Sequence, residues 1–88
     1  IDGLTAAVSA EAATDGVLVN SVAPGFIDTE LTRNTLGIKG MKELALQAPI
    51  QRVGTTEEVA KFVTWLASPE NTYISGQNIA IDGGFTRV

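Results

Sequence analysis

One stretch, residues 19–29, constrains the fold of this chain more than any other. It reads VNSVAPGFIDT, and with the two residues before it gives a nearly continuous apolar run that predicts a strand over residues 17–23. A strand that is apolar at almost every position suits a parallel sheet covered on both faces. The run ends at Pro24-Gly25, where a fixed backbone angle followed by a free one predicts a sharp turn. Because ligands bind just beyond the carboxyl ends of such strands, residues 24–29 are the candidate site.

A helix is expected before this strand, over residues 1–13. Apolar residues recur there at spacings of three and four along one helical face, at Ile1, Leu4, Val8 and Ala12. Asp15-Gly16 supplies the stop, because glycine adopts the left-handed conformation that helix ends commonly use. The chain opens inside this pattern with neither Met nor a signal peptide, so we expect it to be part of a longer protein.

A second helix is expected from residue 56 to about residue 67. Thr55 and Glu58 have the spacing of a capping box, in which hydroxyl and carboxylate each accept an otherwise unpaired backbone N–H. A catalytic pair of Glu57 and Glu58 is the alternative, but neighbours on a helix point about 100° apart, which favours capping. The residues predicted to be buried are Val59, Phe62, Val63 and Leu66.

Between the turn and this helix, residues 30–36 and 39–47 predict two short helical pieces divided by Gly37 and Gly40. Glycines near both ends of the break favour a segment that moves as a unit. A plain helical connector is the alternative, and composition does not decide between the two. Near the end of the chain, residues 77–81 predict a short strand closed by the sequence DGG.

Composition excludes several kinds of chemistry. Without Cys or His, the 88 residues hold no disulfide, thiol nucleophile, serine–histidine relay or soft metal site. The six basic residues are scattered and the net charge is −4, so nucleic-acid binding is disfavoured. No apolar run approaches the roughly 20 residues of a membrane span. We expect residues 1–88 to form a single partial domain with no nucleic-acid or membrane partner, and the lack of cysteine fits the cytoplasm.

The order and spacing of these motifs resemble the short-chain dehydrogenase/reductase family. VNSVAPGFIDT is similar to the segment in which an Asn-x-x-x-Pro-Gly turn holds the nicotinamide end of NAD or NADP, and SGQNIAIDGG resembles the family's last strand and terminal Asp-Gly-Gly. The resemblance spans essentially the whole chain, but only the C-terminal third or so of a typical member. It implies an α/β fold, the C-terminal part of a Rossmann-type doubly wound parallel sheet, ordered helix, strand, substrate-loop helices, helix, strand.

The resemblance also implies a cofactor-binding site at Pro24, Gly25, Ile27 and Thr29. Backbone N–H and C=O groups around Ile27 would face the nicotinamide carboxamide, and the Thr29 hydroxyl would bond to the carboxamide or the pyrophosphate. From the residues alone, a turn explains Pro24-Gly25, and Thr29 is a good N-cap for a helix beginning at Glu30. The two roles of Thr29 are compatible, because a helix start attracts anionic groups.

Two other polar residues invite functional readings. Asn20 lies in the apolar strand, where an unpaired amide would cost about 1 to 3 kcal/mol, so a partner in neighbouring backbone is favoured over a ligand. Tyr73 does not match the family's catalytic Tyr-x-x-x-Lys, because Gln77 stands four residues later. We expect Tyr73 to pack with its hydroxyl in water.

No catalytic residue and no metal ligand is therefore assigned to this chain. The resemblance implies that the catalytic Ser, Tyr and Lys precede Ile1 in a longer NAD(P)-dependent oxidoreductase that moves hydride between nicotinamide and a carbonyl or alcohol. Its motifs look most similar to the 3-oxoacyl-carrier-protein reductase branch, and a homo-oligomer is implied. The 88 residues alone are expected to be inactive. A non-catalytic, self-associating module is the alternative.

Overall fold

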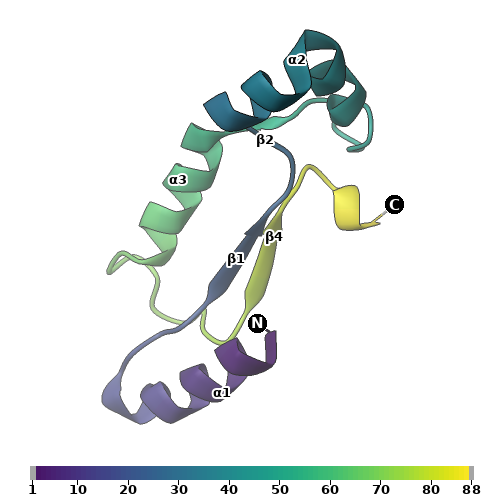
Figure 1. The fold of residues 1–88 in the computed structure, drawn as a ribbon. Coiled ribbons are helices and arrows are strands. Elements are labelled where there is room, and N and C mark those ends of the chain that lie inside the picture. Colours follow the sequence, from purple (N-terminus) through teal and green to yellow (C-terminus); the bar gives the residue numbers. More distant parts are fainter. Residues whose placement is uncertain (1, 88) are drawn as a thin grey trace.

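The computed structural model describes residues 2–87, and its centre is a pair of parallel strands (Figure 1). Strand β1 (Ser21–Pro24) pairs with β4 (Asn78–Ile81), so that Val22 lies opposite Ile79. Helix α1 lies at the end where both strands begin, and helix α2 lies at the opposite end (Figure 1). The expected parallel α/β arrangement is confirmed, and the turn after β1 points toward α2.

Strand β1 begins later than the sequence predicted, at Ser21 rather than at residue 17. The residues before it pair with a loop instead of a strand: Val19 N donates to Ser75 Oγ (3.0 Å), and Gly76 N donates to Val19 O (2.7 Å). Asn20 bonds to the same loop through both ends of its amide, donating to Ile74 O (2.9 Å) and accepting from the N–H of residue 77 (3.1 Å). The predicted backbone partner of Asn20 is confirmed.

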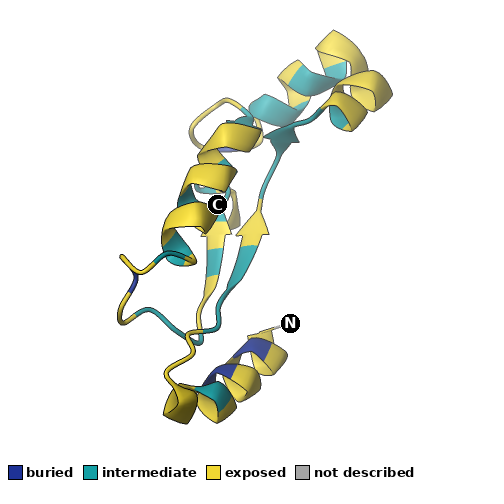
Figure 2. Ribbon diagram, turned by 90° about the vertical axis from the view of Figure 1, so that its left-hand side faces the viewer, coloured by how far each residue is buried: buried dark blue, intermediate teal, exposed yellow. Residues whose placement is uncertain are grey.

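Helix α1 (Asp2–Ala12) continues as the 3₁₀ turn η1 (Ala13–Asp15) and ends at Gly16, whose φ of 74° is the predicted left-handed stop. Its buried residues are Thr5 and Ser9, whereas the apolar Leu4 is 67% exposed (Figure 2). Ser9 lies against Gly76, where an added Cβ would be 2.8 Å from its Oγ. The helix therefore packs by its small polar face, and the apolar stripe faces outward; Ile1 lies outside the described residues.

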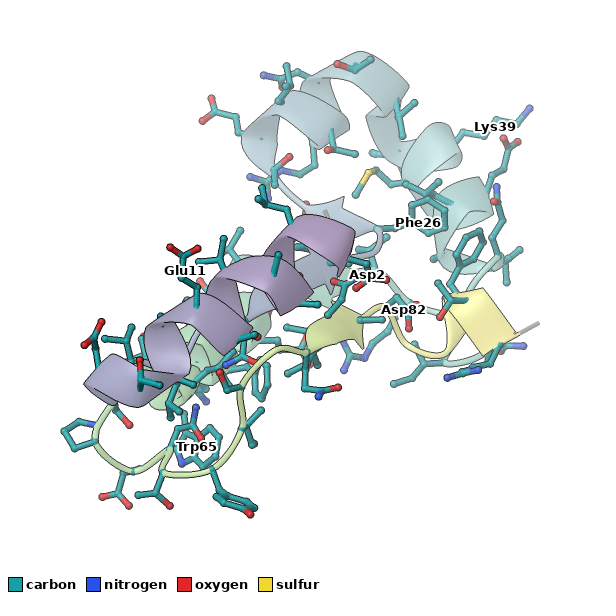
Figure 3. The ribbon with its side chains drawn as sticks, turned by 90° about the horizontal axis from the view of Figure 1, so that it is seen from below. Asp2, Glu11, Phe26, Lys39, Trp65 and Asp82 are labelled. Atoms are coloured by element: carbon teal, nitrogen blue, oxygen red, sulfur yellow. The ribbon has the colours of Figure 1, made fainter. Side chains whose placement is uncertain are left out.

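Helix α2 (Glu30–Ala45) contains the two predicted pieces, with a break at Gly37 (φ 68°, ψ −178°). Gly40 does not divide them but lies inside the second piece, against the Leu36 side chain. The second piece ends at residue 45, two residues earlier than predicted. Charged side chains such as Lys39 point outward (Figure 3).

Helix α3 (Thr56–Leu66) begins with the predicted capping box of Thr55 and Glu58. It runs alongside the β1–β4 pair (Figures 1 and 2). The predicted burial of its apolar face is only partly confirmed: Val59, Phe62 and Leu66 are half-buried, and Val63 is 41% exposed. The physical reason is that the sheet beside α3 has only two strands, β1 and β4, in the described part of the chain.

A second, very short parallel pair was not predicted. Strand β2 (Ile27–Asp28) pairs with β3 (Gly54–Thr55), and η2 (Phe85–Arg87) forms a 3₁₀ turn near the end of the chain. Two residues are too few to show a periodic pattern, so the sequence carries no signal for this ladder. It is nevertheless what ties the candidate segment to the start of α3.

The arrangement is open. Among the described residues, Ala48 is the only buried hydrophobic residue, and it is still 4% exposed. The radius of gyration is 15.5 Å, against about 12 Å for a compact domain of this length. None of the helices described here is long and apolar enough to cross a membrane.

Candidate functional site

The candidate segment leaves β1 at Pro24 and turns in direct contact with the end of β4. Gly25 N donates to Ile81 O (2.9 Å), and a Cβ added at Gly25 would lie 2.7 Å from Asp82 Cβ and 2.9 Å from Asp82 Cα. Real Cβ atoms essentially never approach backbone so closely. Glycine at position 25 is thus required by the close approach of two chain segments.

Asp82 builds the turn that supports this contact. Its carboxylate accepts hydrogen bonds from Gly84 N (2.9 Å) and Thr86 N (3.1 Å). The pKa of Asp82 lies below its usual value, first because of the Thr86 side chain and also because of the backbone N–H groups of Thr86 and Gly84. The turn brings Phe85 edge-on to Phe26, with ring centroids 4.9 Å apart. Asp82 is therefore a fixed, ionised structural acceptor.

The segment of residues 48–50 closes the other side of this turn. Ile50 N donates to Gly83 O (3.3 Å), and Gly83 has a φ of 61°. A Cβ at Gly83 would lie 2.5 Å from Ile50 Cγ2, and one at Gly84 would lie 3.2 Å from Pro49 Cγ. The DGG sequence thus serves two contacts at once, with the Pro24-Gly25 turn and with residues 48–50.

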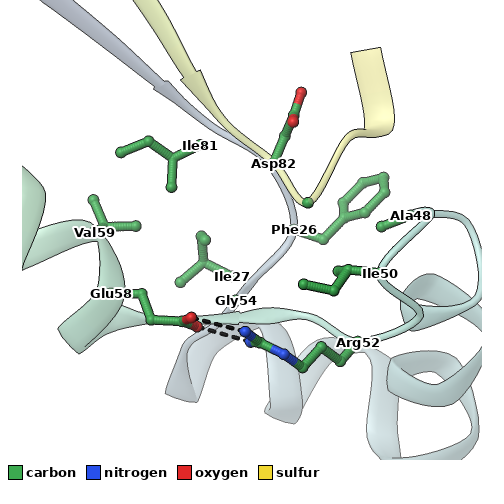
Figure 4. Close-up of a pocket in the computed structure, with 11 residues that line it drawn as sticks. Phe26, Ile27, Ala48, Ile50, Arg52, Gly54, Glu58, Val59, Ile81 and Asp82 are labelled. Carbon is green, nitrogen blue, oxygen red and sulfur yellow. Dashed lines mark hydrogen bonds and ion pairs between the residues drawn. The ribbon is translucent and has the colours of Figure 1, made fainter. Parts of the chain in front are cut away.

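A cavity of about 110 Å³ lies beneath the turn (Figure 4). Its walls are mainly apolar, with Ile27, Val59 and Ile81 facing one another (Figure 4). Arg52 and Glu58 lie at its rim, joined by two hydrogen bonds of 2.8 Å, from Nη1 to Oε1 and from Nη2 to Oε2. Apolar side chains therefore form the floor of the candidate site, and one ion pair lies at its rim.

Glu58 is held ionised by this arrangement. Its Oε1 also accepts from Thr55 N (2.9 Å), while its own N–H donates to Thr55 Oγ1 (3.1 Å). The pKa of Glu58 is lowered to about 2, mainly by the hydrogen bond from Arg52 and next by the hydrogen bond from the Thr55 backbone. The same carboxylate raises the pKa of Arg52. The capping role predicted for Glu58 is confirmed, and the ion pair is an addition to it.

Thr29 is the N-cap of α2. Its Oγ1 accepts from Thr32 N (3.1 Å) and lies 2.8 Å from Thr32 Oγ1. This confirms the capping reading from the residue pattern. A hydroxyl oxygen has two lone pairs and one proton, so a cap does not exhaust its hydrogen-bonding capacity.

A larger hollow of about 460 Å³ lies between α2 and residues 51–53. Asp28 and Arg33 border it, with Arg33 Nε 3.5 Å from Asp28 Oδ1. Asp28 Oδ1 is buried and has no hydrogen-bond partner among the described residues. The hollow adjoins the candidate segment on the side of the break at Gly37.

The four residues predicted to bind cofactor, Pro24, Gly25, Ile27 and Thr29, lie along one short segment from the end of β1 to the start of α2. Sequence reasoning singled out DGG as a motif but assigned it no contact, and it missed Arg52 and Gly54. The available signal was Gly54, placed directly before a capping box, since an interior glycine marks close backbone approach. No cluster of three or more potential metal-ligating carboxylates occurs in residues 2–87, and the full sequence has neither Cys nor His.

Parallel strands, crossover helices and a turn at the carboxyl end of β1 define an α/β protein of the Rossmann type. Comparison with known proteins agrees. Residues 1–86 match the family described as Enoyl-(Acyl carrier protein) reductase. The chain is 43% identical over 82 residues to a 3-oxoacyl-[acyl-carrier-protein] reductase of Vibrio cholerae, covering 93% of this chain and 33% of that protein. It is 44% identical over 80 residues to a tropinone reductase homolog of Arabidopsis thaliana, covering 90% of this chain and 30% of the homolog.

Solved structures show the same relationship. ElxO with NADP bound superposes with a TM-score of 0.90 at 35% identity, covering 99% of this chain and 36% of that one. A short-chain dehydrogenase family protein from Francisella tularensis gives a TM-score of 0.87 at 29% identity, with coverages of 99% and 40%. The chain belongs to the short-chain dehydrogenase/reductase family and resembles the C-terminal portion of its 3-oxoacyl-carrier-protein reductase branch. It spans about a third of the length of the curated relatives it matches.

Proposed function

We propose that this chain is a single partial domain that supplies the nicotinamide-binding turn of an NAD(P)-dependent short-chain oxidoreductase. The observation that carries the proposal is the turn itself, which leaves the carboxyl end of β1 and is held in place by Asp82 and β3. Ligands of open parallel sheets bind at this edge. The ElxO structure, which is similar over nearly the whole chain, contains NADP.

In this proposal Pro24 and Gly25 shape the turn, and the backbone around Ile27 faces the carboxamide of the nicotinamide. Thr29 adds a hydroxyl at the N-terminus of α2, where the helix start favours an anionic group such as pyrophosphate. When bound, NADH or NADPH would supply the hydride that reduces a carbonyl, and NAD or NADP would accept the hydride that an alcohol gives up. The chain's own residues bind and orient the cofactor, and the reacting substrate is a carbonyl or alcohol.

The relatives named as 3-oxoacyl-[acyl-carrier-protein] reductases support a 3-oxoacyl thioester as the substrate of the whole enzyme. We assign the catalytic Ser, Tyr and Lys to the part of the relatives that this chain does not span. The complete enzyme is proposed to be a cytoplasmic homo-oligomer, with neither nucleic acid nor membrane as a partner.

A chimera tests this function. The 88 residues replace the matching segment of the Vibrio cholerae reductase, and NADPH and NADH oxidation with a 3-oxoacyl thioester is compared with that of the unmodified reductase and the 88-residue chain alone. We expect turnover by the chimera and none by the isolated chain. A folded chimera that binds neither cofactor would contradict the proposal and favour the non-catalytic module. Turnover by the isolated chain would contradict the assignment of the catalytic residues.

Thr29→Ala separates the two roles of Thr29 in the same chimera. Loss of the cap lowers stability by about 0.5 to 2 kcal/mol. If the hydroxyl also bonds the cofactor, cofactor binding weakens by roughly 1 to 2 kcal/mol. We expect both changes, measured as melting temperature without ligand and as the Kd of NADP. Thr29→Ser, which retains the oxygen, is the control and keeps both close to their original values. A lower melting temperature with an unchanged Kd would leave Thr29 as a cap only.

A further inference from the structure

The Arg52–Glu58 ion pair combines high exposure with a close and well-defined geometry. The Arg52 side chain is 51% exposed and that of Glu58 is 45% exposed, yet the two groups meet in a bidentate contact with both distances at 2.8 Å. Exposed ion pairs typically contribute little to stability, because water screens them and ordering two long side chains costs entropy. The fixed geometry of the Arg52–Glu58 pair is therefore better explained by the backbone that the pair holds in place.

The backbone immediately before Arg52 is strained. Gln51 has a φ of 62° and is the only non-glycine residue with positive φ in the described part of the chain. Its N–H donates to Ala48 O (2.8 Å), which closes a tight turn, and Arg52 then extends along the cavity rim to Glu58 (Figure 4). Backbone strain of this kind persists only where surrounding contacts over-determine it, and it clusters at functional sites.

What the pair holds is β3. Glu58 Oε1 accepts from Thr55 N as well as from Arg52, so a single carboxylate oxygen ties the arginine to the β3 backbone. Strand β3 pairs in turn with β2: Gly54 N donates to Phe26 O (2.8 Å), and a Cβ at Gly54 would lie 2.9 Å from Ile27 Cδ1. A displacement of β3 therefore displaces the segment that carries Ile27.

We propose that Arg52 and Glu58 are positioning residues for cofactor binding, which fix the Phe26–Asp28 backbone through β3 without touching the cofactor themselves. This inference rests on the proposed function, because it assigns that backbone to the nicotinamide. The pair contributes to the affinity for the cofactor by keeping the turn in its binding conformation, so that less ordering is needed when the cofactor binds.

Glu58→Gln in the chimera described above isolates this role. Glutamine still serves in a capping box, so the variant keeps the cap of α3 and loses only the ion pair. The matched control is Glu57→Gln, which makes the same charge change at a neighbouring residue that has no ion pair or side-chain hydrogen bond in the described chain. We expect Glu58→Gln to raise the Kd of NADP by about three- to tenfold, with kcat changed by less than about twofold. Glu57→Gln leaves both unchanged.

A second variant and a second measurement distinguish positioning from general destabilisation. Arg52→Gln should raise the Kd as Glu58→Gln does, and the double variant should be no worse than either single variant, because both remove one interaction. Amide hydrogen exchange without cofactor should accelerate at residues 26–29 and 54–55 in Glu58→Gln but not in Glu57→Gln. Multiplying effects in the double variant, or unchanged exchange at these residues, would overturn the proposal.

The exchange measurement also separates this inference from the proposed function. Faster exchange together with weaker NADP binding supports both. Faster exchange with unchanged NADP binding would show that the pair holds the segment but that the segment does not bind the nicotinamide, which overturns the positioning role in cofactor binding. A chimera that binds no cofactor before any substitution contradicts the proposed function directly.

Discussion

The isolated 88-residue chain is expected to self-associate at micromolar concentration rather than remain a 9.2 kDa monomer. Its accessible surface is 6321 Å², whereas a compact monomer of this mass exposes about 4,900 Å². Large apolar side chains that are exposed contribute to this difference, and they include Leu4, Val17, Leu31, Ile38 and Trp65. At about 25 cal/mol per Å², covering a few hundred Å² of such surface provides several kcal/mol for association.

Three surfaces are available for this association. The outward stripe of α1 carries Leu4 and Val8, and each strand of the two-stranded sheet has one edge that no other described strand covers. A two-stranded sheet is marginal by itself, and an uncovered edge recruits other chains. Sedimentation velocity or light scattering across a concentration series measures the outcome. Leu4→Glu, with Asp2→Glu as a charge-neutral control on the same helix, should reduce association if α1 contributes. A compact monomer at all concentrations would contradict this prediction.

The order of the helices and of strands β1 and β4 was predictable because each of these elements carries a local signal, which the two-residue strands β2 and β3 do not. The helix stop at Gly16, the capping box at Thr55 and the short strand before the DGG sequence depend on local residue types, and all three are confirmed. Burial was less predictable. An apolar stripe shows which face of a helix prefers to be covered, but not whether the same chain supplies the cover, and Leu4 shows the difference.

The site was predictable as a segment but not as an assembly. Pro24-Gly25 and DGG were both recognisable, yet their contact joins residues more than fifty positions apart and leaves no periodic trace in the sequence. Arg52 was not identified because its contact with Glu58 depends on the direction in which the chain leaves the strained residue Gln51, just before Arg52. Whether the residues from Pro24 to Thr29 bind a cofactor is still a prediction for the chimera to test.

Gly25→Ala is expected to have a large effect for the addition of a single methyl group. The new Cβ would lie 2.9 Å from Asp82 Cα, which is backbone and cannot rotate away, so the turn and β4 must separate. Overpacking of this kind costs typically about 1 to 3 kcal/mol, and the separation also threatens the hydrogen bond from Gly25 N to Ile81 O. Because that turn is the proposed nicotinamide site, NADP affinity should fall along with stability.

In the chimera, we expect Gly25→Ala to lower the melting temperature by several degrees and to weaken NADP binding at least about tenfold. Thermal unfolding measures the first effect, and titration at a temperature where the protein is fully folded measures the second. Gly3→Ala is the matched control, since nothing lies within 4 Å of its Cβ position and alanine favours helix α1. It should leave NADP binding unchanged and should not lower the melting temperature. If Gly25→Ala also left the melting temperature and NADP binding unchanged, the turn at Gly25 would not be in close contact with Asp82. If Gly25→Ala lowered the melting temperature without weakening NADP binding, the contact between Gly25 and Asp82 would serve only stability, and the nicotinamide would have to bind elsewhere.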